Sequence, residues 1–366
     1  MLTSKSLRLL GEEGDRRLES RVKELKASMK KLVIYGTGEA GLAIHGILKD
    51  NGVEVYCFTN SDPSRWNGSI NDISVVSPES LKNIKNVCVL IASCDSRAII
   101  ERISNVGISD YDWDLYLSMS ALPMREVYLK NIDKIKNIGK VLGDNLSRKV
   151  LFTLVKHAFS LDSKLLSSIC QPNQYFINNR FAIKKGDVVI DGGAYVGDTI
   201  TAVLNRCGNK FGMIHSFEPN KKNYVALNNY VRDQKLNKVV TTYNVGLADK
   251  SDSRCFSGNG SSFHLNSVHG SGGKRIKLTS VDETFGESRV DFIKMDLEGA
   301  ELDALKGSKK VIRRDKPRLA VCVYHLPDHL WKIPLYILSL VPKYKLFMRH
   351  HTEGRHETVV YADHII

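Results

Sequence analysis

Residues 181–366 alternate short apolar segments with helical stretches, and this alternation constrains the fold more than any other feature. Five apolar segments predict parallel strands at Asp187–Ile190, Met213–Phe217, Val239–Val245, Val290–Met295 and Arg318–Tyr324. Two later segments, Tyr344–Met348 and Glu357–Tyr361, flank a short turn and predict a terminal hairpin. The pattern therefore predicts an α/β domain with a doubly wound parallel sheet and an antiparallel edge strand.

Residues 31–117 show the same alternation on a smaller scale. Apolar strands are predicted at Leu32–Tyr35, Val53–Phe58 and Val87–Ala92, and a helix is predicted at Ser96–Asn105. We expect a second, smaller α/β domain here. A length of 366 residues is consistent with two domains.

The remaining regions are expected to be helical. Residues 118–180 lack a strand pattern and predict a helical connector, with helices at Val150–Phe159 and Leu161–Ile169, that becomes the lid of the domain at 181–366. Residues 1–30 predict an amphipathic helix that docks on its own domain or on a second subunit, as in a homodimer. Its apolar face carries Leu18, Val22, Leu25 and Met29.

The chain is basic, with 53 Lys or Arg against 40 Asp or Glu. A charge of +13 suggests nucleic acid, an acidic membrane surface or an anionic substrate as a partner. The surplus concentrates in residues 121–185, which hold twelve basic and four acidic side chains. This basic stretch could gather an anionic acceptor or contact an acidic membrane, or it could be a solvated helical face.

The cysteines and the first thirty residues bear on location. Seven scattered cysteines contain no C-x-x-C pair and are expected to be reduced thiols. The first thirty residues do not resemble a secretory signal, and no apolar run reaches the length of a membrane span. We expect a cytoplasmic protein.

A glycine-rich loop follows the first strand of the domain at 181–366. Glycines at the carboxyl end of a strand let the backbone approach a ligand closely. Glu218 ends the next strand and could accept hydrogen bonds from both hydroxyls of a ribose. Asp249 follows the third strand and could contact an adenine or simply occupy a turn. The predicted ligand-binding residues of the loop are Asp191, Gly192, Gly193, Ala194 and Gly197.

Three motifs together resemble one family, the FkbM-type S-adenosylmethionine-dependent methyltransferases. They are the D-x-G-A-x-x-G-D-T-like loop at 191–199, Phe217-Glu218-Pro219, and the I-K-x-D-x-E-G-A-E signature at 293–301. The resemblance covers about residues 170–363. Further matching segments are Gln174-Tyr175-Phe176, Leu305-Lys306-Gly307, Val323-Tyr324-His325, Arg349-His350-His351 and Thr358-Val359-Val360-Tyr361.

The resemblance implies S-adenosylmethionine as cofactor and in-line transfer of its methyl group to a nucleophile. Asp296, Glu298 and His325 follow the fourth and fifth strands, whose ends face the cofactor in this sheet order, and they are the predicted catalytic residues; Asp296 is also a predicted cofactor ligand. His325 suits a general base at neutral pH, or it could orient the substrate. Asp296 and Glu298 could instead bind a divalent metal. Glu301 fits a first-turn acid that the helix dipole favours.

The small domain carries a complete G-x-G-x-x-G at Gly36, Gly38 and Gly41, between a strand and a helix. The next strand ends in Asn60 where a dinucleotide site would have an acid. The segment resembles small Rossmann-like domains of sugar-modifying enzymes. A structural or partner-docking role, a nucleotide or nucleotide-sugar site and an NAD(P) site all stay open.

The leading functional hypothesis is O-methylation of a hydroxyl. Relatives of this type modify bacterial surface polysaccharides, so the expected acceptor is a glycan, a nucleotide-activated sugar or another hydroxyl-bearing small molecule. A nucleic-acid methyltransferase is disfavoured, because an acidic loop, 296–299, stands where base methylation uses Asn/Asp-Pro-Pro-Tyr/Phe. A third hypothesis is a nucleotide-sugar or NAD binder acting through the first domain. His264 and His269, in the Gly/Ser-rich segment Ser257–Gly273, could touch substrate.

Overall fold

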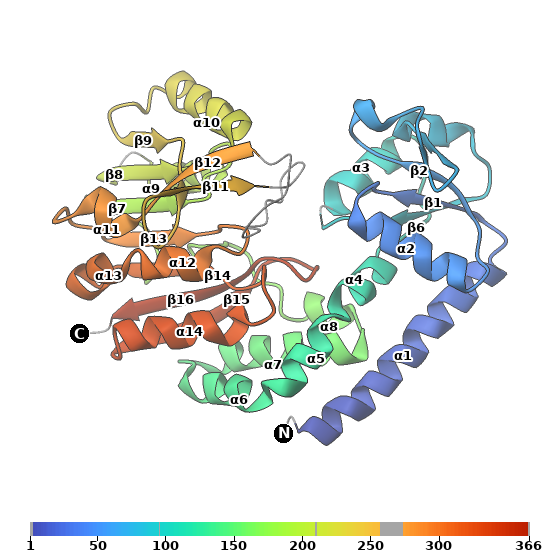
Figure 1. Ribbon diagram of the computed structural model, residues 1–366, viewed down its shortest axis with the longest axis horizontal. Coiled ribbons are helices and arrows are strands. Elements are labelled where there is room, and N and C mark those ends of the chain that lie inside the picture. The colour runs from blue at the N-terminus through green and yellow to red at the C-terminus, as the bar shows by residue number, and fades with distance from the viewer. Residues whose placement is uncertain (1–2, 95, 209–210, 257–273, 365–366) are drawn as a thin grey trace. The chain divides into compact units, whose positions relative to one another are not determined.

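The computed structural model describes residues 3–94, 96–208, 211–256 and 274–364 (Figure 1). The chain divides into two compact units. Unit 1 comprises Met1–Ile132, Phe152–Ile169 and Thr352–His356, and unit 2 comprises Asp133–Leu151, Cys170–His351 and Glu357–Ile366. Among the described helices, none combines the length and the apolar composition that crossing a bilayer requires.

Unit 1 begins with one long helix, α1 (Ser4–Ala27). Thr3 and Ser6 form a reciprocal capping box at its start, which satisfies backbone N–H groups that the helix itself cannot bond. Val22 and Leu25 are buried, as the apolar face predicts. The prediction for Met29 was wrong: the helix ends before it, its φ is +54°, and its side chain is 86% exposed.

The sheet of unit 1 has six strands in the order β3-β4-β2-β1-β5-β6. All neighbours are parallel except the β3–β4 hairpin. The predicted strands correspond to β1, β2 and β5, whereas the shorter β3, β4 and β6 were not predicted. The elements are β1 (Lys31–Tyr35), α2 (Glu39–Asp50), β2 (Val55–Thr59), the 3-10 turn η1 (Pro63–Arg65), β3 (Ser69–Ile70), β4 (Ile73–Val76), η2 (Pro78–Asn83), β5 (Val87–Ile91), α3 (Ser96–Asn105) and β6 (Tyr111–Asp112).

Five helices follow and are shared between the units: α4 (Asp114–Ala121), α5 (Met124–Lys130), α6 (Ile132–Val141), α7 (Asn145–Ser160) and α8 (Lys164–Ser167). Helix α7 starts five residues before the predicted helix, and α8 is shorter than predicted. Within unit 1, Arg125 donates to the backbone oxygens of Ala158 and Phe159, at 2.9 and 2.8 Å. This contact joins α5 to the end of α7.

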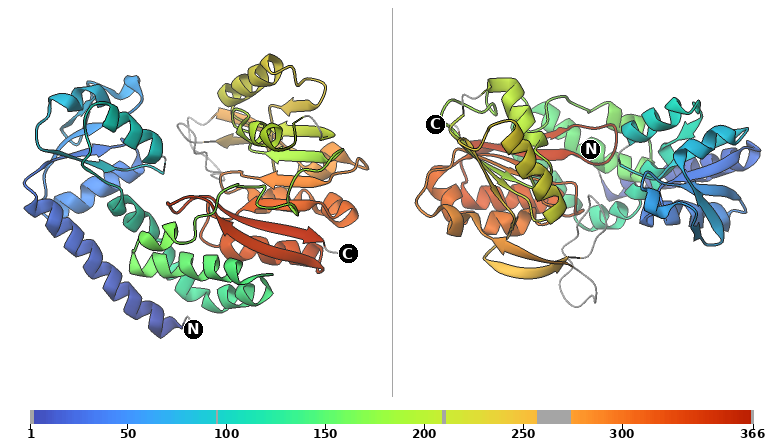
Figure 2. Two further views of the ribbon diagram at one scale, coloured as in Figure 1. Left: turned by 180° about the vertical axis from the view of Figure 1, so that it is seen from behind. Right: turned by 90° about the horizontal axis from the view of Figure 1, so that it is seen from above.

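Unit 2 contains a seven-stranded sheet in the order β15-β16-β14-β13-β7-β8-β9 (Figure 2). Its strands are β7 (Val188–Gly192), β8 (Met213–Phe217), β9 (Val240–Tyr243), β13 (Phe292–Met295), β14 (Arg318–Cys322), β15 (Tyr344–His350) and β16 (Thr358–His364). The doubly wound order and the terminal hairpin are confirmed. The antiparallel strand is not at the edge, however, because β16 inserts between β14 and β15 and pairs antiparallel with both.

Helices connect the parallel strands of unit 2 and cover the sheet (Figure 1). They are α9 (Asp198–Cys207), α10 (Lys221–Asp233), α11 (Val281–Phe285), α12 (Glu301–Lys306), α13 (Lys309–Asp315) and α14 (His329–Leu340). The central strands β13 and β14 are buried along their whole length. This explains their continuous apolar character, which is typical of parallel strands covered on both faces.

A separate three-stranded sheet in unit 2 was not predicted. It has the order β10-β12-β11, with β10 (Gly246–Leu247), β11 (Asp252–Phe256) and β12 (Lys274–Thr279). Strands β11 and β12 pair antiparallel on either side of the Gly/Ser-rich segment. That segment, with His264 and His269, lies outside the described residues.

Candidate active site

A cavity of about 240 Å³ opens in unit 2 where the parallel strands end at their carboxyl sides. This is the edge at which open α/β sheets bind ligands. Four predicted site residues line it: Gly193, Glu218, Asp296 and Glu298. The other lining residues are Tyr195, Asp198, Pro219, Asn223, Gly246, Leu247, Ile276, Leu278, Leu297, Ala300, Tyr324 and Glu357.

The glycine-rich loop leaves β7 and passes directly over the end of β13. Gly193 has φ +74°, and a Cβ there would lie 1.9 Å from the backbone oxygen of Asp296. The N–H groups of Gly193 and Ala194 both donate to Phe217 O at 3.0 Å. The loop is therefore fixed against β8 and β13, and only glycine fits at its tightest point.

Asp191 and Lys294 form a buried ion pair beneath this loop. Lys294 Nζ lies 3.2 Å from Asp191 Oδ1 and donates to the backbone oxygens of Gly192 and Gly193, at 3.1 and 2.7 Å. Burial alone would lower the pKa of Lys294, but Asp191 and the nearby Asp296 and Asp198 raise it above its usual value. The pair supports the cavity floor from below.

The other predicted loop residues also lie behind the cavity wall. Asp191 and Ala194 are fully buried, and neither they nor Gly192 and Gly197 are among the lining residues. Gly197, with φ +103°, forms the N-cap of α9. These residues shape the floor, and a direct ligand contact by them stays a prediction.

Glu218 stands at the end of β8 with its carboxylate held by backbone groups. Oε2 accepts from Tyr195 N at 3.0 Å, and Oε1 accepts from Asn220 N at 2.9 Å. Burial raises the pKa of Glu218 above its ordinary value. Each carboxylate oxygen can accept a second hydrogen bond, so a pair of ligand hydroxyls could still be bound here.

Asp249 lies elsewhere. Its Oδ1 is 3.2 Å from Arg254 Nη2, and the residue is not among those that line the cavity. The structure thus places Asp249 in a surface ion pair beside β11, and its predicted contact with an adenine stays a prediction.

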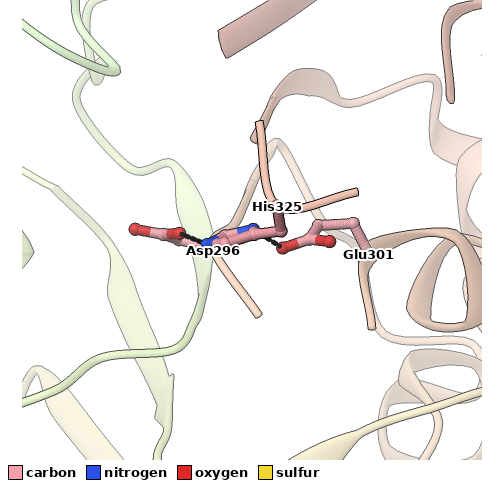
Figure 3. Close-up of side chains that lie close together, drawn as sticks. All are labelled: Asp296, Glu301 and His325. Atoms are coloured by element: carbon pink, nitrogen blue, oxygen red, sulfur yellow. Dashed lines mark ion pairs between the residues drawn. The ribbon is translucent and has the colours of Figure 1, made fainter. Parts of the chain in front are cut away.

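His325 is fixed between carboxylates (Figure 3). Its Nδ1 lies 2.7 Å from Glu301 Oε1, and its Nε2 lies 3.5 Å from both Asp296 Oδ1 and Glu298 Oε2. Glu301 is fully buried, and its other oxygen lies 3.2 Å from His329 Nδ1. The three predicted catalytic residues are therefore brought together, and Glu301 joins them.

This environment changes the chemistry expected of His325. Burial alone would lower its pKa, but Glu301, Asp296 and Glu298 raise the pKa of His325 to about 9. The imidazole is therefore protonated at neutral pH, whereas the interpretation as a base assumed its unperturbed pKa. Glu301 is more than a first-turn acid of α12, because it holds the proton on His325.

Three residues around Asp296 were not identified as site residues. Asp296 Oδ2 accepts from Tyr175 OH at 2.8 Å, and Oδ1 accepts from Tyr324 OH at 3.1 Å. The same Tyr324 OH lies 3.2 Å from Glu357 Oε1, so its one proton can be donated to either carboxylate. Tyr175 and Tyr324 lie in segments that match the FkbM-type family in sequence, so the sequence could have indicated them as site residues. Glu357 is brought here by the terminal hairpin.

Carboxylates outnumber cations on the cavity wall. Asp296, Glu298 and Glu357 line the wall, whereas the imidazolium of His325 lies behind them and is paired with the buried Glu301. Lys294 is likewise neutralised by its partner Asp191. Burial raises the pKa of Glu298 and of Glu357 to about 7. The cavity therefore attracts positive charge and repels anions.

The same cluster bears on the predicted divalent metal. Ligand atoms of Asp296, Glu301 and His325 all lie within 4.8 Å of one another. The 2.7 Å separation of His325 Nδ1 and Glu301 Oε1 is that of an ion pair when the imidazole is protonated. We therefore treat the cluster as ion-paired, and metal binding stays a prediction.

The predicted N-terminal loop lies in unit 1 at the turn from β1 to α2. Gly36 N donates to Thr59 O at 2.9 Å, and a Cβ on Gly41 would lie 2.0 Å from Gly36 O. Gly36 and Gly41 are thus required by close packing. Asn60 donates to Thr37 Oγ1 at 2.7 Å. Whether this loop binds a nucleotide stays a prediction.

The seven-stranded order, the glycine turn and the acid at the end of β8 define a doubly wound α/β domain with a cavity at the carboxyl ends of its strands. Residues 191–352 match the model of the methyltransferase FkbM domain. Residues 28–112 match a second family model, described as C2185-like, N-terminal.

One of the similar solved structures shares the fold over the whole chain. Methyltransferase FkbM from Methylobacillus flagellatus is 21% identical, aligns over 98% of both chains and has a TM-score of 0.66. A putative rRNA methylase from Clostridium thermocellum is 12% identical over 51% of this chain and 91% of its own, with a TM-score of 0.34. Fibrillarin from Aeropyrum pernix, solved with bound S-adenosyl-L-methionine, is 14% identical over 50% of this chain and 68% of its own, with a TM-score of 0.33. None of the curated proteins compared with the chain matches it.

Proposed function

We propose that the protein is an S-adenosylmethionine-dependent O-methyltransferase. The observation that carries the proposal is Glu218, which two backbone N–H groups hold in place on the wall of an acidic cavity. Its carboxylate suits the two hydroxyls of a ribose, and Gly193 lines the cavity beside it. The excess of carboxylates suits a cofactor that carries a sulfonium and an ammonium group.

The charge of the cavity also bears on the acceptor. An anion at the reacting position would be repelled by Asp296, Glu298 and Glu357, so the group that receives the methyl should be neutral. A hydroxyl meets this condition, and we propose a sugar hydroxyl of a glycan or a nucleotide-activated sugar. Phosphate groups of such an acceptor would lie away from the acidic cluster, as would those of a nucleic acid.

Calorimetric titration with S-adenosylmethionine tests the cofactor. We expect Glu218→Gln to weaken binding about 10-fold or more, because hydrogen bonds to a charged group are worth about 1.5–3 kcal/mol. Glu287→Gln is the matched control, since the Glu287 side chain is 99% exposed. Absence of binding to the unaltered protein would refute the proposal.

A methyl-transfer screen tests the acceptor. Labelled cofactor is supplied with glycans, nucleotide sugars, small hydroxyl compounds and RNA, and the labelled product is identified. Label on a sugar oxygen supports the proposal. Label on RNA alone would contradict it.

A further inference from the structure

We infer that Glu298 accepts the proton that leaves the acceptor hydroxyl, and that His325 is a fixed cation beside it. The inference rests on the proposed function, because it assigns roles within the same cavity. It replaces the expectation that His325 is the base. The contacts of each candidate group in the cluster lead to this assignment.

Both ring nitrogens of His325 face carboxylates. Its Nδ1 faces Glu301 at 2.7 Å, and its Nε2 faces Asp296 and Glu298 at 3.5 Å. Glu301 is itself fixed, because the N–H of Leu297 donates to Oε1 at 2.7 Å. Carboxylates beside both nitrogens favour the protonated imidazolium, in which both nitrogens are donors and neither has a lone pair for a further proton.

Two other acids that line the cavity are held by hydrogen bonds. Asp296 accepts from Tyr175, and Glu357 accepts from Gln174. The single O–H of Tyr324 lies between them, 3.1 Å from Asp296 Oδ1 and 3.2 Å from Glu357 Oε1, and it donates to one of the two at a time. Each of these carboxylates therefore already has a hydrogen-bond donor.

Glu298 differs from both. Within the described part of the chain, its carboxylate has one polar contact, the 3.5 Å pair between Oε2 and His325. Its side chain is 35% exposed and lines the cavity. Its backbone has φ +53°, an unusual conformation for this residue type, and the next residue, Gly299, has φ +102°. The turn is held because the N–H groups of Leu297 and Gly299 both point to Glu301 Oε1.

The electrostatics of the cavity agree with the geometry. Burial raises the pKa of Glu298, His325 lowers it, and Asp296, Glu301 and Glu357 raise it, with a result of about 7. These are the charged groups that face Glu298 from β13, α12, the end of β14 and the start of β16. A base with a pKa near the working pH is the most effective.

The proposed step couples transfer of the methyl group to transfer of the hydroxyl proton. The acceptor oxygen forms a bond to the methyl carbon while the carbon–sulfur bond breaks and its electron pair stays on sulfur. The hydroxyl proton passes to the Glu298 carboxylate, which becomes a neutral acid and later loses the proton to water. No oxidant or further reactant is required.

Proton release on cofactor binding gives a test that needs no acceptor. Titrations with S-adenosylmethionine at pH 7, in buffers that differ in ionisation enthalpy, report the protons released. The sulfonium is a permanent positive charge, so it should ionise Glu298 and release part of a proton. We expect Glu298→Gln to lose most of this release while the Kd stays within a few-fold, Glu357→Gln to lose only a smaller part, and the exposed Glu287→Gln to retain it. S-adenosylhomocysteine, whose sulfur is neutral, should release less.

The outcomes separate the inference from the proposed function. If the cofactor does not bind, the proposed function fails. If it binds and Glu298→Gln releases as many protons as the unaltered protein, or if Glu357→Gln abolishes the release, the inference is overturned. A neutral His325 at pH 7, seen by its nitrogen chemical shifts, would also overturn it. In the methyl-transfer screen we expect Glu298→Gln to lose about 100-fold or more of the rate.

Discussion

At the scale of single residues, Glu301 determines the state of the cavity. Burial alone would raise its pKa, but His325 and His329 lower it well below the ordinary range. The carboxylate therefore stays ionised and holds the proton on His325. It does this without lining the cavity, so Glu301 is a positioning residue.

The first prediction concerns Glu301→Gln. Losing this charge should lower the pKa of His325 from about 9 toward its usual range, because the largest force that raises it is removed. A titration that follows the nitrogen chemical shifts of His325 measures the change. Asp303→Asn, whose aspartate pairs with Lys306 on the same helix, is the control. A His325 that still titrates near 9 in Glu301→Gln would contradict the assignment.

The second prediction concerns the pH dependence of stability. The raised pKa of His325 adds stability that is complete below about 6.5 and is lost as the pH rises through about 9. The raised pKa values of Glu298 and Glu357 also make the folded state less stable as the pH rises. Their contribution to the loss of stability falls between about pH 4.5 and 7. We therefore expect the free energy of unfolding to fall between pH 6.5 and 9. Urea unfolding measures it, and Glu301→Gln should show a smaller fall above pH 7.

The third prediction concerns the buried pair beneath the loop. Lys294→Met leaves Asp191 as an unpaired buried charge and should cost about 3–5 kcal/mol of unfolding free energy. The double variant Asp191→Asn with Lys294→Met should recover part of this loss. Denaturant unfolding measures the free energy of unfolding of both variants. Equal losses of this free energy in the single and the double variant would show that Asp191 and Lys294 are not coupled.

At the scale of elements, the positions of strands could be predicted and their lateral order only in part. Apolar runs bounded by polar residues placed β7, β8, β13 and β14 to within a few residues, because these strands are buried. Which strand lies at the edge depends on how the hairpin folds back, and no local pattern records that β16 enters beside β14. The small sheet β10-β12-β11 escaped prediction because two of its strands flank a Gly/Ser-rich segment.

The residues of the candidate site could likewise be predicted only in part. Glu218 and Asp296 could be predicted because each directly follows a strand whose end meets the cavity. Glu357 could not, because it reaches the cavity only through the pairing of β16 with β14. Glu301 has a sufficient local explanation as a first-turn acid, and its contact with His325 depends on how β13 and β14 are paired.

The fourth prediction tests the glycine turn between β7 and α9. Gly193→Ala would place a Cβ 1.9 Å from Asp296 O, so the loop must shift and cofactor binding should weaken about 10-fold or more. Gly208→Ala is the control: it also has a positive φ, of +56°, but a Cβ there meets no atom within 4 Å. Calorimetric titration compares the two. Equal losses would mean that backbone strain alone, without the clash, accounts for the effect.

At the scale of the whole molecule, the net charge of the chain is positive, whereas the wall of the cavity is acidic. Most of the surplus of basic residues lies in 121–185. On helix α6 of unit 2, Lys134 and Lys140 are exposed and Lys136 pairs with Asp133 at 3.3 Å. An acceptor with a neutral reacting hydroxyl and a distant anionic group would suit both regions.

The fifth prediction follows from this separation of charge. Reversing Lys134, Lys136 and Lys140 to Glu should raise the KM for a phosphorylated or acidic acceptor several-fold and leave the Kd for the cofactor unchanged. A neutral acceptor should show no change, and the effect should shrink at high salt. An unchanged KM for the anionic acceptor would mean that these lysines form only a solvated surface.

The division of the chain into units limits how the protein can be cut, fused or recombined. Each unit is assembled from three separate stretches of sequence, so the polypeptide passes from one to the other five times. No single cut releases either unit intact, and a protein made by joining halves of two genes would break both. Any exchange of a unit between relatives has to replace three stretches together, including the five residues Thr352–His356 between β15 and β16.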